Sequence, residues 1–332
     1  MGFVAAQRNV GIREVAAHAG VSDSTVSNVT NRPEVVAAPT LERVHASMAE
    51  LGYVVNAVAR QLRLGGASTL GMIVTNIADA VFAELAHDCE VEAENAAMTI
   101  LLSSSDGSTE REERYLRMFD EQRIGGLLID PVGAPTPAMA SLADRGMPVV
   151  LLGTAGDLDR FCSVVVDDVL GGSLAVEHLV AGGRRRIVFV GPASAAELWH
   201  GARNAADGHP GVELSWLEVA GQGFDDGVAA AGGMLGDLPD AVSAATDALA
   251  VGLLQHLVGN GVRVPEQLAI VGYGDGDAAR QATVPLTTIR RPRRELAAEA
   301  IRLMHDQLSR PTAHAHESMT IAPELVVRAS TS

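Results

Sequence analysis

The chain has 332 residues, 47% of them hydrophobic and 20% charged, which is enough to form a small domain and a larger one with its own core. Its formal net charge is −16, which at first argues against a nucleic-acid partner. No signal sequence opens the chain, and no apolar run approaches the length of a bilayer span. We therefore expect a cytoplasmic protein with no membrane partner.

The two cysteines, Cys89 and Cys162, stand alone in apolar surroundings and match no metal-ligand spacing. We expect both to be buried free thiols, with no disulfide framework, no metal site and no cofactor.

Residues 12–31 contain two short helical patterns that meet at a tight turn. Apolar residues recur at i, i+3, i+4 and i+7 in the first pattern: Ile12, Val15, Ala16 and Ala19. Gly20 ends this helix, and Ser22 is a suitable N-cap for a second helix that begins at Asp23. The outer face of the second helix is polar and suits hydrogen bonds in a DNA major groove: Asp23, Ser24, Thr25 and Asn28. A capped helix hairpin also occurs in ordinary helical domains, so this segment alone leaves the two interpretations about even.

Two further patterns favour the DNA-binding interpretation. An apolar stripe from Thr40 to Leu51 predicts a third helix that closes a small core. After Gly52 an amphipathic segment follows, with Arg60 and Arg63 available to phosphates.

The charge is unevenly distributed along the chain. Residues 1–65 hold six arginines and five acidic residues, a net charge of +1, so the remainder carries −17. The acidic part should repel DNA and confine binding to the first 65 residues. Because this segment is only weakly basic, we expect two copies to act together, with a shallow salt dependence.

The rest of the chain alternates between strand and helix patterns. Strands are predicted at 70–75, 99–103, 126–130, 148–153 and 163–166, and then at 187–191, 213–219, 240–244 and 268–272. Helices are predicted at 82–97, 110–122, 170–181, 227–235 and 247–259. Two such sets predict two lobes, each with a doubly wound parallel sheet, and a ligand cleft at the carboxyl ends of the strands.

The sequence gives little support to the two other classes considered, an enzyme and a solute-binding receptor. The glycine clusters match neither a dinucleotide fingerprint nor a phosphate loop, there is no GxSxG motif, and the histidines are scattered singly, so we expect no enzyme and no catalytic residues. A solute-binding receptor would share the predicted two-lobed fold but would have no use for the first 65 residues.

Four segments together resemble the LacI/GalR family of bacterial transcription regulators. They are REVAAHAGVSDSTVS, ELGYVVNAVARQLRLG, DDVLGGSLAVEHLVAGGRRRIVFVG, and RVPEQLAIVGYGD followed by PLTTIRRP. They stand in the family's order between Ile12 and Arg328, so the resemblance covers nearly the whole chain.

The resemblance implies three parts. Residues 1–52 would form an all-α helix-turn-helix head, 53–66 a hinge helix and linker, and 67–332 a periplasmic-binding-protein-like body that binds effector and dimerises. The chain would cross between the two lobes near Val166, Ile289 and Pro323. In the family the leucine that matches Leu62 enters the minor groove and kinks the duplex. The implied DNA-binding residues are Ser22, Asp23, Ser24, Thr25, Asn28, Asn31, Tyr53, Asn56, Ala59, Arg60 and Leu62.

The head departs from the family at several positions. Asn28 stands where the family usually has arginine, and Asp23 where an acidic residue is unusual, which predicts an atypical operator. Ala37 replaces the usual serine N-cap of the third helix, a change worth about 1 kcal/mol. Gly11 and Val55 replace a threonine cap and a hinge proline.

The effector cleft departs further. Leu198 stands at the position of a ligand-clamping arginine, and Gly153, Gly274 and Thr246 replace two aspartates and an asparagine. The residues expected at the cleft are Asp79, Phe82, Leu198, Phe224, Thr246, Asp247 and Asp275. Asp247 and Asp275 serve equally well as a helix cap and a turn residue.

These changes leave two interpretations of the cleft. It binds a ligand that is less polar or differently polar than a typical sugar, which we favour, or it no longer responds to a small molecule. The resemblance implies a homodimer on a near-palindromic operator, with ligand changing DNA affinity. Repression is expected because it is the usual mode of regulation in the family. No leucine heptads follow the body, so we expect a dimer rather than a tetramer joined by a helical tail.

Overall fold

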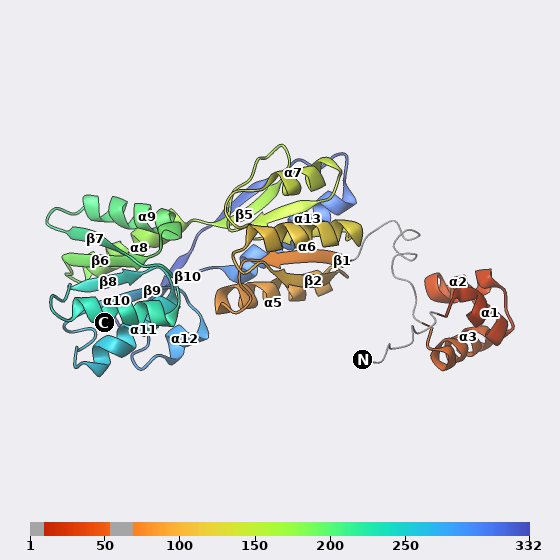
Figure 1. The fold of residues 1–332 in the computed structure, drawn as a ribbon, viewed down its shortest axis with the longest axis horizontal. Coiled ribbons are helices and arrows are strands. Elements are labelled where there is room, and N and C mark those ends of the chain that lie inside the picture. Colours follow the sequence, from red (N-terminus) through yellow and green to blue (C-terminus); the bar gives the residue numbers. More distant parts are fainter. Residues whose placement is uncertain (1–9, 54–68) are drawn as a thin grey trace. The chain divides into compact units, whose positions relative to one another are not determined.

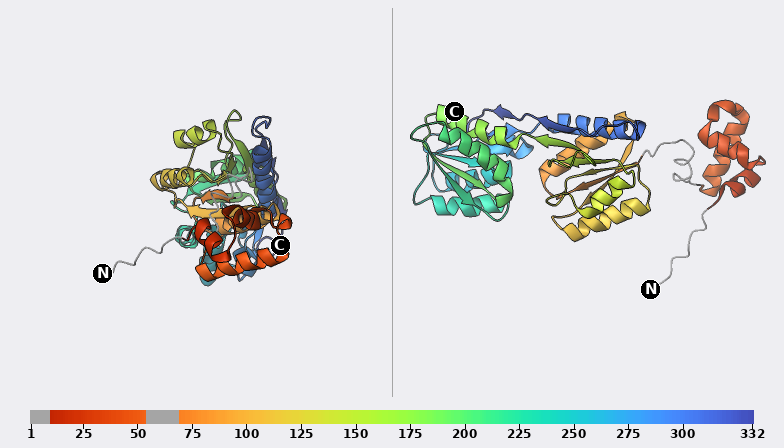
Figure 2. Two further views of the ribbon diagram at one scale, coloured as in Figure 1. Left: turned by 90° about the vertical axis from the view of Figure 1, so that its right-hand side faces the viewer. Right: turned by 90° about the horizontal axis from the view of Figure 1, so that it is seen from above.

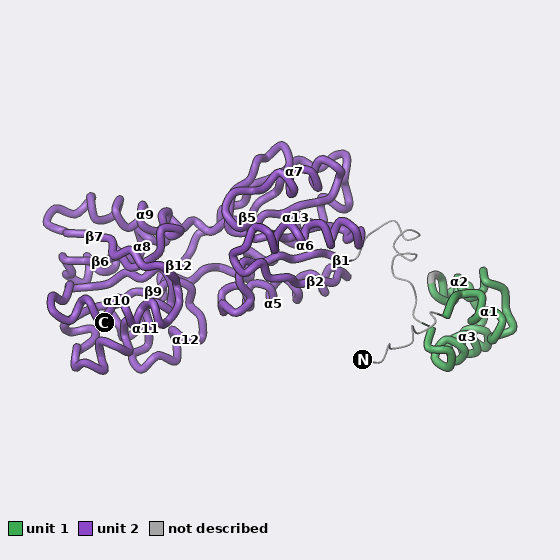
Figure 3. The backbone as a smooth tube through the Cα atoms, viewed as in Figure 1, with its two compact units in different colours: residues 1–67 green, residues 68–332 purple. Residues whose placement is uncertain are grey.

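The computed structural model describes residues 10–53 and 69–332, and it divides the chain into two compact units (Figure 3). The units are Met1–Ala67 and Ser68–Ser332. Four of the predicted DNA-binding residues lie outside the described ranges: Asn56, Ala59, Arg60 and Leu62. In those ranges no helix combines the length and apolarity that a bilayer span requires.

In the described residues 10–53, the first unit has three α-helices around a small core (Figure 1). Helix α1 (Ile12–Ala19) and helix α2 (Asp23–Asn31) are followed by a 3₁₀ turn (Pro33–Val35) and by α3 (Ala38–Leu51). The buried residues come from all three α-helices: Val15, Ala16, Ala19, Val26, Val29 and Val44. Helix α3 begins two residues before the predicted Thr40. Its N-cap is Ala37, which makes no side-chain capping bond, as the sequence predicted.

The first lobe of the second unit has a six-stranded parallel sheet in the order β11-β5-β4-β3-β1-β2. The strands are β1 (Thr69–Val74), β2 (Thr99–Ser104), β3 (Gly126–Ile129), β4 (Val149–Leu152), β5 (Cys162–Val166) and β11 (Ser318–Ile321). One face of the sheet packs against α5 (Ala80–Asn95) and α13 (Arg293–Ser309), and the other against α6 (Thr109–Glu121) and α7 (Pro137–Asp144).

The second lobe has a six-stranded sheet in the order β12-β10-β9-β8-β6-β7, parallel except for the β10–β12 pair. Its strands are β6 (Arg186–Gly191), β7 (Glu213–Glu218), β8 (Ala241–Ala244), β9 (Ala269–Gly274), β10 (Thr287–Arg290) and β12 (Glu324–Val326). Its helices are α8 (Asp168–Ala181), α9 (Ala196–Asp207), α10 (Phe224–Met234), α11 (Asp247–Gly259) and α12 (Asp277–Gln281), with a 3₁₀ turn at Ala193–Ala195.

The chain crosses between the lobes three times, at the places that the resemblance implied. The crossings join β5 to α8, β10 to α13, and β11 to β12. As a result α13 and β11, which come late in the chain, complete the first lobe beside elements that come early (Figure 2). The architecture confirms the predicted two-lobed α/β body with doubly wound sheets, and the strands and helices predicted for the body are all present. The predicted hinge helix lies outside the described residues.

Candidate functional site

The outer face of α2 presents the polar residues that the sequence singled out. Ser22 caps the helix, because its Oγ accepts a hydrogen bond from the backbone N–H of Thr25 at 3.1 Å. Ser22, Asp23, Ser24 and Asn28 are exposed and Thr25 is half-buried. Val26 and Val29 point into the core and fix which face of α2 is turned outward.

Asp23 has a partner that sequence reasoning did not foresee. Its carboxylate lies 3.6 Å from Nε of Arg13 on α1, and both side chains are well exposed. An exposed pair of this kind contributes about 0–1 kcal/mol, so it leaves the carboxylate available to a stronger partner.

Tyr53 and Asn31 are the other predicted DNA contacts within residues 10–53. Tyr53 is half-buried and packs against the core of the first unit. Asn31 is the last residue of α2, and its side chain lies outside what the structure describes.

A cavity of about 290 Å³ lies between the two lobes of the second unit. The first lobe contributes residues from the start of α5 and from α13, and the second lobe contributes residues that follow β8 and β9. The cavity therefore lies where the carboxyl ends of parallel strands meet, the expected place for a ligand in this architecture. Its lining is Asp79, Ala80, Val81, Glu84, Leu85, Thr246, Asp247, Ala248, Gly274, Gly276, Asp277, Ala278, Arg291, Arg293 and Leu296.

Three of the seven predicted effector residues line this cavity: Asp79, Thr246 and Asp247. The side chain of Asp79 accepts a hydrogen bond from the N–H of Val81 at 3.0 Å and so caps α5. Thr246 caps α11 by accepting from the N–H of Leu249 at 3.1 Å. The helix-cap role considered for Asp247 thus belongs to its neighbour Thr246.

The other four predicted effector residues do not line the cavity. Leu198 is only 7% exposed and belongs to the hydrophobic core of the second lobe, because an apolar side chain on this face of α9 packs inward. Phe82 packs against the core of the first lobe, and Phe224 is exposed at the first position of α10. Asp275 is buried in a separate, arginine-rich depression.

Asp247 is a buried carboxyl group held by two hydrogen bonds. Its Oδ1 accepts from the Thr288 hydroxyl at 2.5 Å and its Oδ2 from the N–H of Gly276 at 3.0 Å. Burial raises the pKa of Asp247 above its ordinary value, and these hydrogen bonds only partly offset that effect. The residue therefore fixes the loop after β9 at the edge of the cavity.

Asp275 occupies a turn, as one interpretation of the sequence proposed, and has a left-handed backbone with φ of +65°. It also joins three segments, because its carboxylate pairs with Arg328 and, at 2.8 Å, with Arg290. Burial alone would raise the pKa of Asp275, but hydrogen bonds from the two arginines leave it below its ordinary value.

Arg291 is a cavity residue that sequence reasoning missed. Its buried Nε has no hydrogen-bond partner among the described residues, and its guanidinium carbon lies 6.0 Å from the centre of the Tyr273 ring. The charge of Arg291 also acts on Asp130, which follows β3 in the first lobe. Burial raises the pKa of Asp130, and a hydrogen bond from Thr75 and the charge of Arg291 only partly offset this rise. The run Arg-Arg-Pro-Arg-Arg at 290–294, directly after a strand, was the available signal.

A second missed arginine holds one wall of the cavity in place. Arg293, at the start of α13, pairs with Glu84 and Asp88 of α5 at 2.5 and 2.7 Å. These two carboxylates already neutralise Arg293. Arg291 is therefore the better candidate to bind a ligand.

A helix-turn-helix unit joined to a two-lobed body with an interlobe cavity defines a ligand-responsive DNA-binding transcription regulator. The sequence matches the family described as "Bacterial regulatory proteins, lacI family" over residues 11–56 and the "Periplasmic binding protein-like domain" over 176–331. It is 30% identical over 327 residues to the HTH-type transcriptional repressor PurR of Photobacterium profundum, covering 96% of this chain and 98% of the relative. The chain belongs to the LacI family.

Solved structures agree with this assignment over almost the full length. The lac repressor dimer bound to operator and the anti-inducer ONPF superimposes with a TM-score of 0.81 at 27% identity, covering 98% of this chain and 99% of that one. The regulator CelR in complex with cellobiose gives a TM-score of 0.70 at 28% identity, covering 97% and 100%.

Proposed function

We propose that the protein is a repressor that binds a near-palindromic operator as a homodimer, with the outer face of α2 in the major groove of each half-site. The observation that carries this is the exposed polar row from Ser22 to Asn28, held outward by Val26 and Val29. The full-length relative named as a repressor supports both the direction of regulation and a role without catalysis. A weakly charged head supports two heads acting together.

The operator is tested by selecting genomic fragments with the purified full-length chain. We expect enrichment of an inverted repeat, with protection of both halves in footprinting. If no inverted repeat is enriched, the proposed dimeric operator complex is wrong. Placing the recovered site before a reporter gene then tests repression, because an activator would raise the reporter signal.

We propose that the effector is a small molecule with an anionic group, rather than a neutral sugar. The cavity of about 290 Å³ lies just below the range of about 300–1,000 Å³ that is usual for ligand sites, which favours a small ligand. The unpartnered Nε of Arg291 offers a charge-assisted donor to a carboxylate or phosphate, and Val81, Leu85 and Leu296 offer an apolar wall. These features support a cleft that binds a ligand other than a typical sugar, rather than a cleft that has lost ligand binding.

Thermal-shift measurements on the full chain test the effector class with four panels: neutral hexoses, nucleosides, aromatic acids and small aliphatic carboxylates. We expect stabilisation by an acid, and loss of that stabilisation in Arg291→Gln. Arg294→Gln is the matched control, since this arginine is 86% exposed and does not line the cavity. Stabilisation by a neutral hexose that persists in Arg291→Gln would contradict the proposal.

A further inference from the structure

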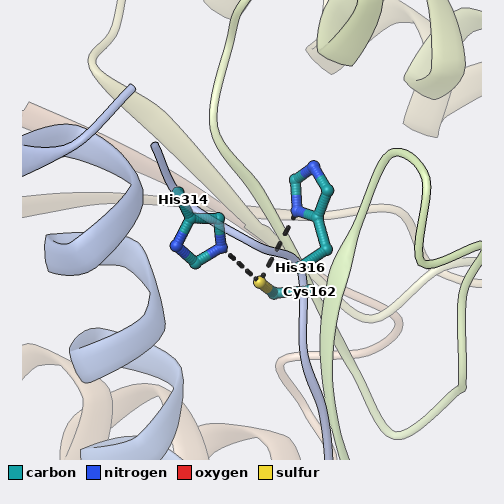
Figure 4. Close-up of side chains that lie close together, drawn as sticks. All are labelled: Cys162, His314 and His316. Carbon is teal, nitrogen blue, oxygen red and sulfur yellow. Dashed lines mark hydrogen bonds between the residues drawn. The ribbon is translucent and has the colours of Figure 1, made fainter. Parts of the chain in front are cut away.

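Three potential metal ligands, none of which lines the cavity between the lobes, converge in the first lobe (Figure 4). Sγ of Cys162 lies 3.1 Å from Nε2 of His314 and 3.7 Å from Nδ1 of His316. All three ligand atoms lie within 4.8 Å of one another. Both cysteines are buried free thiols, as expected, but Cys162 is not isolated as the sequence suggested.

The two sulfur–nitrogen distances are close to those around a zinc ion. With bonds of about 2.3 Å to sulfur and about 2.0–2.1 Å to nitrogen, a tetrahedral ion holds its sulfur and nitrogen ligands about 3.5 Å apart. The two measured sulfur–nitrogen distances lie on either side of this value. One thiolate and two imidazoles are ligands that zinc prefers, and the fourth position is left for a water molecule.

The ring of His314 is oriented by a carboxylate. Its Nδ1 lies 2.5 Å from Oδ2 of Asp306, and its side chain is only 4% exposed. With the proton of this imidazole on Nδ1, the Nε2 lone pair faces the sulfur of Cys162. Carboxylate–histidine–metal triads of this kind are common around zinc, and Asp306 is itself held by Arg310.

The main chain brings the three ligands together without needing an ion. Strand β11 pairs in parallel with β5, so that Ser318 lies opposite Ser163, and the N–H of Ser163 donates to the carbonyl of Glu317 at 2.9 Å. His314 and His316 come just before β11, and Cys162 is the first residue of β5. The N–H of Glu317 also donates to Sγ of Cys162 at 3.4 Å. The site is therefore preorganised at the amino end of the sheet.

The surroundings suit a cation. The charges of Asp157 and Asp159 act on His316, and those of Glu317 and Asp306 act on Cys162. Arg302 acts on Cys162 with the opposite sign and pairs with Glu317 at 3.1 Å, and a positive charge on His314 would act on His316. His316 is half-buried, so an ion can approach from its side.

We propose that Cys162, His314 and His316 bind one Zn²⁺ ion per chain, with Asp306 as a positioning residue. On binding, the thiol proton of Cys162 is released to solvent and the sulfur becomes a thiolate ligand. The ion would tie β5 to the segment before β11. Both strands continue at their carboxyl ends into the second lobe, so the site lies at the opposite end of two strands that lead into crossings.

The test measures binding of Zn²⁺, and of Co²⁺ as a spectroscopic probe, to the full chain prepared without a histidine tag. We expect one ion per chain by equilibrium dialysis. The Co²⁺ form should show a thiolate-to-metal charge-transfer band and the d–d bands of tetrahedral coordination. Zinc should also raise the melting temperature, since the preorganised site exists only in the folded protein.

Three variants test the proposed site, and two others serve as controls. Cys162→Ser and His316→Gln should abolish binding, and Asp306→Asn should weaken it by about 10- to 100-fold. Cys89→Ser and the exposed His305→Gln are matched controls that should bind normally. Because His316 is half-buried, His316→Gln should fold even if Cys162→Ser does not. Absence of the charge-transfer band, or undiminished binding by His316→Gln, would show that the three groups form only a hydrogen-bonded cluster.

Discussion

At the scale of single residues, Asn28 offers an exposed side-chain amide on the outer face of α2, able to donate and accept hydrogen bonds at a base edge. We expect Asn28→Ala to weaken operator binding by about 5- to 150-fold, the equivalent of about 1–3 kcal/mol for a lost base contact. The melting temperature should stay unchanged, because the side chain is exposed. Titration of the selected operator by fluorescence anisotropy gives the affinity.

Glu50→Ala, another exposed position in the first unit, is the control for this measurement and should bind operator normally. An Asn28→Ala protein with full affinity for every base at the selected half-site would show that this side chain does not read sequence.

Asp275 provides a prediction for stability and pH. Replacing it with Asn removes the charge that Arg328 and Arg290 neutralise, and we expect a loss of about 1–3 kcal/mol in the free energy of unfolding at neutral pH. Because the folded-state pKa of Asp275 is lowered, its contribution is complete above the ordinary aspartate pKa of about 3.9 and is lost as pH falls below it.

Urea unfolding of both proteins between neutral pH and pH about 3 measures this contribution. The difference between wild type and Asp275→Asn should shrink at the acid end. A difference that is constant across the whole range would mean that the carboxylate charge contributes nothing and that only packing was lost.

At the scale of elements, α8 and α9 approach closely because each carries a glycine at the contact. A Cβ added to Gly172 would lie 1.9 Å from the carbonyl oxygen of Leu198, and one added to Gly201 would lie 1.8 Å from that of Val169. Backbone atoms cannot yield as a flexible side chain can. We therefore expect Gly172→Ala to destabilise the body by about 1–3 kcal/mol through overpacking.

Gly232→Ala in α10 is the matched control, because a Cβ there would meet no atom within 4 Å. This substitution should be neutral or stabilise by about 0.5–1 kcal/mol, since alanine has the better helix propensity. Denaturant midpoints compare the two variants directly. Equal stability of the two variants would contradict the close helix contact.

Sequence analysis did not assign several elements of the body, for different reasons. Helix α9 owes its packing to small residues and backbone contact with α8, which a local apolar pattern does not reveal. Helix α13 does have an inward stripe that includes Leu296, Ile301 and Met304, but its neighbours are early elements of the chain. Strands β11 and β12 are only 4 and 3 residues long, too short to stand out from loops.

At the scale of the whole molecule, the opposed charges of the two parts predict how DNA binding depends on salt. With +1 on residues 1–65 and −17 on the remainder, few phosphates are neutralised per head. We expect operator affinity to fall by less than about 10³-fold between about 50 and 200 mM salt. Anisotropy titrations at several salt concentrations measure the slope, and a steeper fall would mean that most arginines of the first 65 residues contact phosphate.

The sequence by itself determined the helix-turn-helix unit, most strands and five helices of the body, and the three crossings. These features depend on apolar periodicity, caps and turns within a few residues of one another, and on a family resemblance that spans the chain. Only the tertiary structure decided which side chains share a site. It placed Leu198 in a core, brought Arg291 to the cavity, and joined Cys162 to His314 across 152 positions. Such proximity follows from the order of strands in the sheet, with β11 beside β5, and the local pattern of residues carries no record of that order.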